Sequence, residues 1–341
     1  MIKGAIKKVS AGYDLSESET YLSMCEIMEG RASDAQISSF LTALCMKGET
    51  VEEIYACAKV MREKANRITV PAGAVDLCGT GGDDMRTFNI STISSLVVAG
   101  AGVTVAKHGN RSVSSKSGSA DLMEYMGVNI ELNARKVERC IEDVGIGFMF
   151  APRFHLAMKY ALTPRQEIGI RTLFNLIGPL SNPGEVKHQL IGVYDQNLTV
   201  PFAQVLMRFG VKHAMVVHGS GLDELTLTGK NNITELKDGL VYSYTLNPED
   251  VCLGKVDLRD IRANSIDENV DIAHSVLDGE YGPARDTVLL NAGASLYVAD
   301  LVGDITEGIK IAEETIDSGR AKEKLHSLVR YTQKAGGKYG P

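Results

Sequence analysis

The chain has 341 residues, a length that corresponds to about two domains of ~150 residues each. Hydrophobic residues make up 44% and charged residues 23%, a composition that supports a packed core and excludes a disordered or fibrous protein. The 36 basic and 43 acidic residues give a net charge of −7. That balance argues against a protein that binds nucleic acid or an anionic membrane surface.

Six cysteines are scattered along the chain without a C-x-x-C pair or a grouping with histidine. This spacing is unlike a zinc site or a disulfide framework, and it favours a reducing compartment. Residues 1–19 contain no apolar run typical of a secretory signal. Residues 87–106 lack charge, but their Asn, Ser and Thr side chains are unfavourable in hydrocarbon, so we interpret them as buried loop and helix. We therefore expect a soluble, cytoplasmic protein that does not enter a membrane.

The first 70 residues contain three helix starts of the capping-box type, at Ser16–Glu19, Ser33–Gln36 and Thr50–Glu53. Apolar residues recur at helical spacing behind each of these starts. Pro71 then marks a boundary. The pattern predicts a small all-helical domain over residues 1–70.

After Pro71, short apolar runs alternate with helical stretches, which is typical of an α/β domain with a mainly parallel central sheet. One interruption, Thr163-Pro164-x-Gln166, offers an N-cap, a proline at the first helical position and a capping partner. We expect an inserted helix to start there, and the insertion, about residues 163–183, to pack on the N-terminal helices. The α/β domain would then comprise residues 71–162 and 184–341. The predicted strands are residues 74–78, 103–106, 148–150, 189–193 and 213–218.

A glycine-rich loop, Gly79-Thr80-Gly81-Gly82-Asp83, follows the first predicted strand and precedes a helix that begins near Asn89. The backbone N–H groups of such a loop and the positive end of the helix dipole favour phosphate oxygens. The loop is neither a Walker loop nor a dinucleotide motif, because Asp84 takes the place of the last glycine of the latter. A tight turn that binds nothing is the alternative.

A second loop, residues 107–119, follows the second predicted strand and combines lysine and arginine with serines, an asparagine and two glycines. These groups suit a polyanion that also carries sugar hydroxyls. A flexible polar loop is the alternative, and it is less favoured because a glycine-rich loop ends a neighbouring strand.

Two adjacent carboxylates, Asp223 and Glu224, follow the predicted strand 213–218. They suit Mg²⁺, which takes one or two protein carboxylates together with phosphate oxygens, although a solvated acidic loop is the alternative. Arg165 is expected in the first turn of the inserted helix, ten residues after His155. Its guanidinium can bind a carboxylate through two parallel hydrogen bonds, and a surface arginine is the alternative.

Together these motifs resemble the anthranilate phosphoribosyltransferase family. The strings that carry the resemblance are G-T-G-G-D (79–83), N-I-S-T (89–92), K-H-G-N-R-S-V-S-S-K-S-G-S-A-D (107–121), F-N-L-I-G-P-L-S-N-P (174–183) and H-G-S-G-L-D-E (218–224). They occur in order over residues 70–225, whereas the C-terminal third carries no distinctive string. The resemblance implies a small helical domain hinged to a larger α/β domain of the nucleoside phosphorylase and phosphoribosyltransferase type. It also implies a homodimer formed through the helical domains.

The family transfers the 5-phosphoribosyl group of phosphoribosyl pyrophosphate (PRPP) to the amine of anthranilate, with release of pyrophosphate, in tryptophan biosynthesis. The resemblance implies that Ser91, Asp223 and Glu224 hold Mg²⁺. It implies that PRPP is bound by Gly79, Gly82, Asp83, Thr87, Asn89, Ile90, Ser91, Thr92, Lys107, Ser115 and Ser119. It implies that anthranilate passes His108, Asn110, His155, Arg165 and Gly178, and none of these positions departs from the family pattern.

The chemistry of the reaction agrees with these residues. Substitution at the anomeric carbon develops oxocarbenium character while pyrophosphate leaves, so the departing charge must be neutralised. The aromatic amine is already nucleophilic, and positioning should therefore dominate over general-base catalysis. We expect Arg165 to bind the anthranilate carboxylate and Asn110 or His108 to orient the amine.

Two other functions are possible. A pyrimidine nucleoside phosphorylase would share the fold, but it transfers ribose to inorganic phosphate and needs no site for Mg²⁺ and pyrophosphate, which Asp223 and Glu224 favour. A non-catalytic homologue that binds nucleic acid would need a basic surface, and the net charge of −7 argues against it.

Overall fold

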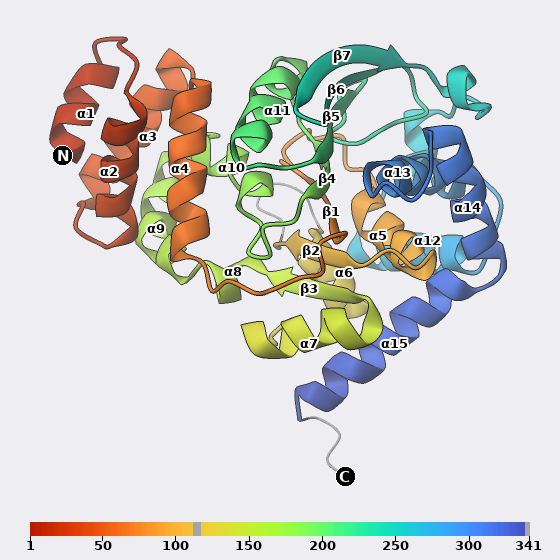
Figure 1. Cartoon of the computed structure of the whole chain (residues 1–341). Coiled ribbons are helices and arrows are strands. Elements are labelled where there is room, and N and C mark those ends of the chain that lie inside the picture. Colours follow the sequence, from red (N-terminus) through yellow and green to blue (C-terminus); the bar gives the residue numbers. More distant parts are fainter. Residues whose placement is uncertain (112–116, 338–341) are drawn as a thin grey trace.

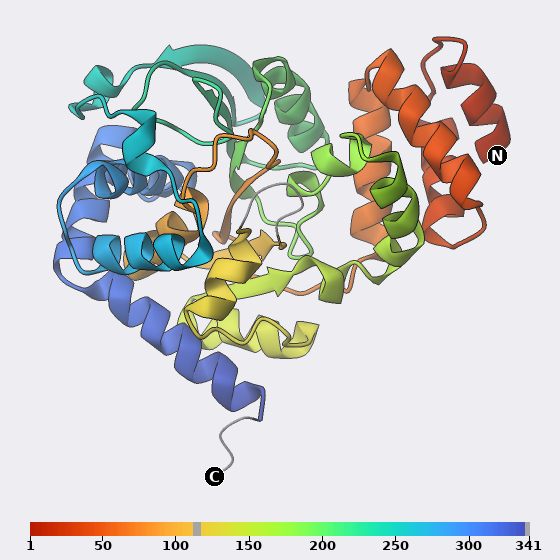
Figure 2. The same cartoon turned by 180° about the vertical axis from the view of Figure 1, so that it is seen from behind.

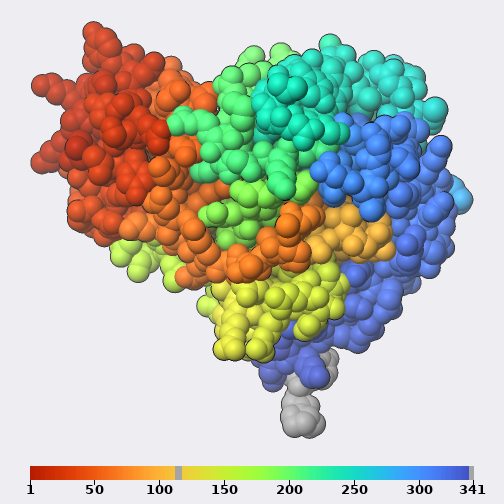
Figure 3. All heavy atoms as spheres, in the orientation of Figure 1, coloured from red at the N-terminus to blue at the C-terminus, as the bar shows by residue number. Residues whose placement is uncertain are grey.

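The computed structural model describes residues 1–111 and 117–337 (Figure 1). Its N-terminal part is entirely helical, and Figure 3 shows it as a lobe beside the larger part of the molecule. The three predicted capping boxes are confirmed, because the side chains of Ser16, Ser33 and Thr50 each accept a backbone N–H of the first helical turn. The helices are α1 (Ile2–Val9), α2 (Glu17–Met28), α3 (Asp34–Lys47) and α4 (Val51–Lys64).

The larger part is built on a seven-stranded sheet of order β3-β2-β1-β4-β5-β6-β7. The first five of these strands run parallel, and β6 and β7 extend the sheet as an antiparallel hairpin, so the prediction of a mainly parallel sheet is confirmed. The five predicted strands exist with ends displaced by a few residues, whereas the hairpin was not predicted. The strands are β1 (Val75–Gly79), β2 (Val105–Gly109), β3 (Ile146–Phe150), β4 (His188–Gly192), β5 (His213–Gly219), β6 (Asn231–Lys237) and β7 (Leu240–Leu246).

Helices cover both faces of the sheet. Val75 and Leu77 of β1 belong to the apolar cluster formed with α5 and α13, whereas Cys78 belongs to the cluster formed with α11 and the N-terminal helices. This division follows from the alternation of side chains along a strand. The helices of this part are α5 (Ile90–Gly100), α6 (Ser119–Tyr125), α7 (Ala134–Val144), α11 (Thr199–Arg208), α12 (Ile266–Leu277), α13 (Pro283–Val298), α14 (Ile305–Asp317) and α15 (Arg320–Ala335). Short 3-10 helices are η1 (Leu156–Met158), η2 (Pro179–Ser181), η3 (Gln196–Leu198), η4 (Pro248–Val251) and η5 (Leu258–Ile261).

The uncharged stretch 87–106 is confirmed as buried loop and helix. Helix α5 lies within it, and every residue from Thr92 to Ala99 is buried. Within residues 1–111 and 117–337, no helix has both the length and the apolar composition needed to cross a membrane.

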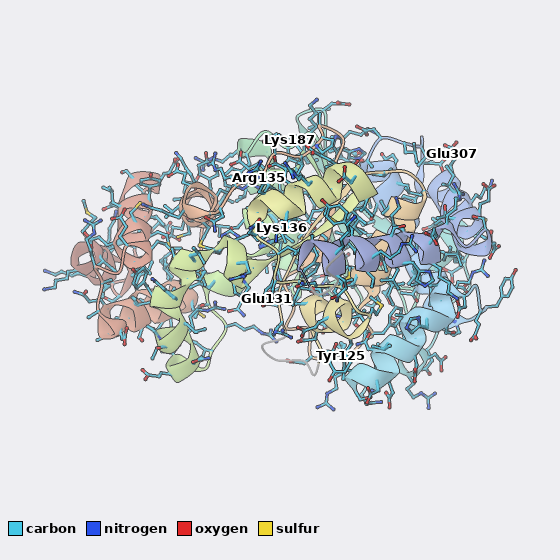
Figure 4. All side chains as sticks on the ribbon, turned by 90° about the horizontal axis from the view of Figure 1, so that it is seen from below. Tyr125, Glu131, Arg135, Lys136, Lys187 and Glu307 are labelled. Atoms are coloured by element: carbon cyan, nitrogen blue, oxygen red, sulfur yellow. The ribbon has the colours of Figure 1, made fainter. Side chains whose placement is uncertain are left out.

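The C-terminal helix α15 is fixed to α7, and the two lie side by side in the view of Figure 4. Lys136 of α7, labelled in that figure, donates from Nζ to the carbonyl oxygen of Ala335 at 2.7 Å. Lys324 of α15 donates in the opposite direction, to the carbonyl oxygen of Val144 at 2.7 Å. Helix α15 thereby covers the edge of the sheet at β3.

The segment between β3 and β4 contains α8 (Ala151–Phe154), α9 (Lys159–Ile168) and α10 (Leu173–Leu176). Helix α9 contacts α2 and α3, and both Figure 1 and Figure 2 show it against the N-terminal helices. The prediction that a helix starts at Thr163 is wrong, because Pro164 lies inside α9 and Arg165 lies in its last turn. The chain is already helical at Met158, so α9 begins earlier, and Pro164 removes one backbone hydrogen bond from its interior.

The parallel register aligns the carboxyl ends of the strands. Gly79 of β1 lies opposite Gly192 of β4, and Gly109 of β2 lies opposite Phe150 of β3. The loops that follow β1, β2 and β5 consequently leave the sheet at the same edge. Many of the residues predicted to form the site belong to these loops or to the strand and helix ends beside them.

Candidate active site

The glycine-rich loop after β1 lies against the acidic loop after β5. The N–H of Gly81 donates to Oδ2 of Asp223 at 2.6 Å. A Cβ atom on Gly79 would lie 2.2 Å from the same oxygen, and a Cβ atom on Gly192 would lie 1.5 Å from the carbonyl oxygen of Asp223. The absence of side chains at both glycines is therefore what allows the two loops to approach.

The glycine-rich loop turns sharply and is held from outside. Gly82 has φ 81° and Asp84 has φ 59°, a region that is unfavourable for residues other than glycine. Arg171, between α9 and α10, donates from Nη2 to the carbonyl oxygen of Gly82 and to Oδ2 of Asp84, the latter at 2.9 Å. Its guanidinium also lies over the ring of Tyr194 at 4.7 Å. Arg171 was not predicted as a site residue, because its partners lie far away in the sequence.

A second set of contacts joins the acidic loop to β2 through the start of α5. Oε1 of Glu224 accepts from the N–H of Ser91 at 3.1 Å, and Nζ of Lys107 donates to the hydroxyl of Ser91 at 3.4 Å. Lys107 is only 1% exposed and also donates to the carbonyl oxygen of Leu77 at 2.5 Å. The loops after β1 and β5, the start of α5 and the end of β2 therefore meet around these residues.

The charges at this meeting point are mutually unfavourable. Burial raises the pKa of Asp223 and of Glu224, and the neighbouring carboxylates, Asp83 beside Asp223 and Asp223 beside Glu224, raise them further. Burial lowers the pKa of Lys107, whereas the negative charges of Asp76 and Glu224 oppose that change. A bound cation would stabilise the ionised forms of these acidic groups.

The donor set at this point consists of oxygen atoms, from the carboxylates of Asp223 and Glu224 and the hydroxyl of Ser91. Such donors fit a hard cation such as Mg²⁺. In the part of the chain that the structure describes, no three His, Cys, Asp or Glu side chains are grouped closely enough to hold a metal ion by themselves. That arrangement is compatible with Mg²⁺, which usually keeps waters and phosphate oxygens in its shell.

Other predicted residues lie around the same loops. The N–H of Asn89 donates to Oδ1 of Asn269 at 2.9 Å, and its Oδ1 accepts from the hydroxyl of Ser117 at 3.2 Å. The carbonyl oxygen of Asn110 accepts from the hydroxyl of Ser119 at 3.3 Å. Thr87 pairs with Arg262 just before α5, Ile90 and Thr92 are buried in α5, and Ser115 lies outside the described residues.

Two buried histidines form a separate group beside this site. The ring centroids of His108 and His155 are 5.1 Å apart, and the two residues are only 8% and 5% exposed. Nε2 of His108 and both ring nitrogens of His155 make no hydrogen bond of good geometry, and the nearest groups are the backbone of Gly178 beside His108 and the backbone of Met61 and Ser181 beside His155. Burial lowers the pKa of both rings, to about 4 for His155, so both are neutral at pH 7. Buried polar atoms without partners are typical of a place where a ligand binds.

Arg165 and Gly178 are the remaining predicted residues. The half-buried guanidinium of Arg165 lies 5.2 Å from the ring centroid of Phe174, and burial lowers its pKa. Among the described residues Arg165 has no ion-pair partner, and no hydrogen bond or ring contact joins it to the two histidines. A Cβ atom on Gly178 would have no neighbour within 4 Å, so there is open space beside it.

Comparison with known proteins begins with two family models. The α/β domain of a glycosyl transferase family matches residues 72–322, and the helical bundle domain of a glycosyl transferase family matches residues 3–65. The fold, the glycine-rich loop and the acidic loop thus define a glycosyl transferase composed of a helical bundle and an α/β domain.

Similar proteins narrow this class. Anthranilate phosphoribosyltransferase from Petrotoga mobilis is 52% identical over 96% of both chains, and that from Thioalkalivibrio sulfidiphilus is 53% identical over 96% of this chain and 98% of its own. The solved structure of the Thermus thermophilus enzyme is 41% identical, with a TM-score of 0.92 over 96% of this chain and 99% of its own. A structure of the Saccharomyces cerevisiae enzyme in complex with PRPP and Mg is 28% identical, with a TM-score of 0.89 over 98% of both chains. The chain belongs to the anthranilate phosphoribosyltransferase family.

Proposed function

We propose that this chain transfers the 5-phosphoribosyl group of PRPP to the amino group of anthranilate, with release of pyrophosphate. The observation that carries the proposal is the meeting of the loops after β1 and β5 with the start of α5 and with β2, through Gly81 with Asp223 and through Lys107 and Glu224 with Ser91. A glycine-rich turn, a buried ammonium and paired carboxylates together suit a sugar that carries phosphate groups and a divalent ion.

The phosphates of PRPP would be bound by the backbone N–H groups of the Gly79–Asp83 loop, by the first turn of α5 and by Lys107. The helix dipole of α5 favours negative charge at that end. Lys107 is held at the site by its hydrogen bond to the carbonyl oxygen of Leu77. Loss of pyrophosphate leaves negative charge on its oxygens, and a cation fixed in advance stabilises that charge without reorganisation.

Asp223 and Glu224, with the hydroxyl of Ser91, would hold Mg²⁺. When bound, the ion would neutralise charge on the leaving pyrophosphate. Burial and then a neighbouring carboxylate, Asp83 beside Asp223 and Asp223 beside Glu224, raise the pKa of these two groups, and this supports the assignment, because a divalent cation would offset both effects.

Anthranilate would bind on the side of His108 and His155, with its carboxylate on Arg165 and its ring beside Gly178. The partnerless nitrogens of the histidines and the unpaired guanidinium support this assignment. His108 is kept neutral by burial, so its Nε2 can accept a hydrogen bond from the amine and orient the nitrogen lone pair, and Asn110 follows two positions later, just after the end of β2. The C–N bond forms as the C–O bond to pyrophosphate breaks, and the amine releases one proton.

The proposal is tested by mixing the purified chain with PRPP, anthranilate and Mg²⁺. Loss of anthranilate fluorescence and release of pyrophosphate should occur in a 1:1 ratio. Phosphate-dependent cleavage of a pyrimidine nucleoside, with no pyrophosphate from PRPP, would instead indicate a nucleoside phosphorylase and contradict the proposal.

We further assign residues 1–70 and the insertion at about 163–183 to one domain, and residues 71–162 and 184–341 to the other. The contacts of α9 with α2 and α3 support this division. Limited proteolysis should cut first near residue 70 or near the two ends of the insertion, and first cuts inside α2 or α3 would contradict it.

A homodimer through the helical domains is proposed because large apolar side chains are exposed there. They are Tyr13, Leu22, Met46 and Ile170, and the adjoining segment before the insertion adds Leu156, Tyr160 and Leu162. Sedimentation of the purified chain should give twice the monomer mass, and replacing Leu22 and Met46 by Lys should give the monomer. A monomeric wild-type chain would contradict the assignment.

A further inference from the structure

A fully buried carboxylate, Asp76, lies in the middle of the apolar strand β1. Its neighbours Val75 and Leu77 point to the side of α5, so Asp76 points to the other face of the sheet, as does His108 on β2. Oδ1 of Asp76 accepts the backbone N–H of His108 at 3.2 Å, and Oδ2 accepts from Nδ2 of Asn182 at 2.7 Å. The carboxylate therefore bridges β2 and the segment that follows α10.

Asn182 is fully used in this bridge. Its Nδ2 donates a second hydrogen bond to the carbonyl oxygen of Ala106 at 3.0 Å, and its Oδ1 accepts from the N–H of Gly184 at 2.8 Å. The side chain is completely buried. Because all its polar atoms are engaged, the side chain of Asn182 has one orientation. It therefore fixes the distance between Asp76 and the backbone of Ala106 and Gly184.

The segment from Gly178 to Asn182 is held at other points too. Nε2 of Gln189 donates to the carbonyl oxygen of Pro179 at 3.2 Å, and Nε of Arg62 donates to that of Leu180 at 2.7 Å. Gly178 begins this segment and borders open space. These hydrogen bonds hold the segment in place beside the open space at Gly178, and Asp76 connects the segment to the backbone of His108.

A buried charge is a poor way to stabilise a fold. Burial raises the pKa of Asp76, although Lys107, Asn182 and the N–H of His108 oppose this. Replacing it by an apolar side chain would deprive the buried N–H of His108 and the amide of Asn182 of their acceptor, so the carboxylate and its two donors form one unit. The carboxylate is better explained by the two groups that it holds in register.

We propose that Asp76 is a positioning residue for phosphoribosyl transfer, which fixes His108 relative to the Gly178–Asn182 segment and so sets the shape of the acceptor pocket. The inference rests on the proposed function, since the acceptor is taken to be anthranilate. It predicts that loss of the bridge weakens the acceptor side of the site more than the PRPP side.

The test is Asp76→Asn, which keeps the shape but turns an amide nitrogen toward Asn182 or His108, each of which also donates. We expect the KM for anthranilate to rise about tenfold or more and the KM for PRPP to rise less. Because the charge of Asp76 also supports the protonated form of Lys107, part of any effect on PRPP comes from the lost charge, and Asn182→Ser, which keeps the carboxylate, should raise the KM for PRPP less than about threefold. The matched control is Glu235→Gln, because Glu235 is also a buried carboxylate with several donors but lies in β6, away from these loops. It should lower the Tm and leave both KM values unchanged.

A second variant, Asn182→Ser, breaks the bridge while leaving the carboxylate in place, and it carries the test if Asp76→Asn does not fold. It should shift the two KM values in the same unequal way. Folded variants with lowered Tm but wild-type kinetics would show a merely structural role and overturn the inference. Wild-type turnover in the same assay separates that result from a failure of the proposed function, and a wild-type chain without turnover would reject both.

Discussion

The N–H of Gly81 and the carboxylate of Asp223 are joined by a 2.6 Å hydrogen bond although 142 positions separate them in the sequence. The contact exists because β1 and β5 run parallel on either side of β4, so their carboxyl ends meet at one edge. It brings the glycine-rich loop and the acidic loop within reach of a single ligand.

Gly192→Ala tests whether the approach of the two loops matters for turnover. The added Cβ would overlap the backbone of Asp223, which cannot yield as a flexible side chain can, so the acidic loop must move. We expect kcat/KM to fall about 100-fold or more. Gly4→Ala in α1, where a Cβ meets nothing within 4 Å, is the matched control and should leave kinetics unchanged. Steady-state assays of both variants decide the matter, and normal kinetics for Gly192→Ala would contradict the proposed convergence.

Arg165→Ala tests the carboxylate-binding assignment. Because the guanidinium has no ion-pair partner among the described residues, its removal should leave stability nearly unchanged and raise the KM for anthranilate about tenfold or more. The KM for PRPP should change far less. Arg330→Ala, which removes an exposed arginine paired with Glu323 on α15, is the control. Equal effects of Arg165→Ala on both KM values would count against the assignment.

Asp223→Asn combined with Glu224→Gln tests the metal site. The double variant should lose Mg²⁺-dependent turnover, since neither amide is a good ligand for the ion. It should keep the wild-type fold and Tm, because removing two carboxylates that repel each other relieves the folded state. Circular dichroism and pyrophosphate release are the measurements. Full activity in the folded double variant would remove both residues from the metal site.

Arg171→Ala tests whether the glycine-rich loop needs the support seen in the structure. Without the hydrogen bonds to Gly82 and Asp84, the strained turn has lost its contact with the α9–α10 connection. The KM for PRPP should rise about tenfold, and the KM for anthranilate should change little. Arg171→Lys keeps the charge but not the planar fork, so its KM for PRPP should lie between that of the wild type and that of Arg171→Ala. An unchanged KM for PRPP in the alanine variant would show that the loop holds its shape alone.

Glu235 allows a prediction about pH and stability. Burial would raise its pKa, but hydrogen bonds from His213, Tyr244 and Tyr297 outweigh burial and lower the pKa to about 2. Since the folded-state pKa lies below the unfolded value of 4.5, the ionised group stabilises the fold at pH 7, and this contribution is lost as the pH falls from about 4.5 to about 2. Glu235→Gln should lower the free energy of unfolding by roughly 3 kcal/mol at pH 7 and by roughly half as much at pH 3. Urea unfolding at both pH values measures this, and an equal loss at both would contradict it.

The elements that could be predicted are those whose signals are local. The capping boxes at Ser16, Ser33 and Thr50 involve residues three apart, and they specify the helix starts correctly. The helix start predicted at Thr163 was wrong because a proline can begin a helix or lie inside one. Which of the two occurs at Pro164 depends on whether the preceding residues are already helical, as they are after α8 and η1. The β6–β7 hairpin was missed although its two-residue turn, Asp238-Gly239, was a usable local signal, since both residues adopt the positive φ that such a turn requires.

The same distinction holds for the site. The glycine-rich and acidic loops could be assigned together because strands of a parallel sheet end at one edge. Arg171 and Asp76 could not, because their partners lie 89 and 106 positions away and only the folded chain brings them together. A charged residue, Asp76, inside the apolar run of β1 indicates that polar groups face it in the folded chain. The sequence does not indicate which groups these are.

The central claim is that three loops at one edge of the sheet bind one pyrophosphorylated sugar together with a divalent ion. A crystal structure of the chain grown with PRPP and Mn²⁺ in place of Mg²⁺ tests it most directly, because Mn²⁺ can be located by its anomalous scattering. We predict an anomalous peak at the carboxylates of Asp223 and Glu224, with the phosphates of the sugar against Gly82 and Lys107. Mn²⁺ or PRPP bound at a place that touches none of these residues would contradict the account.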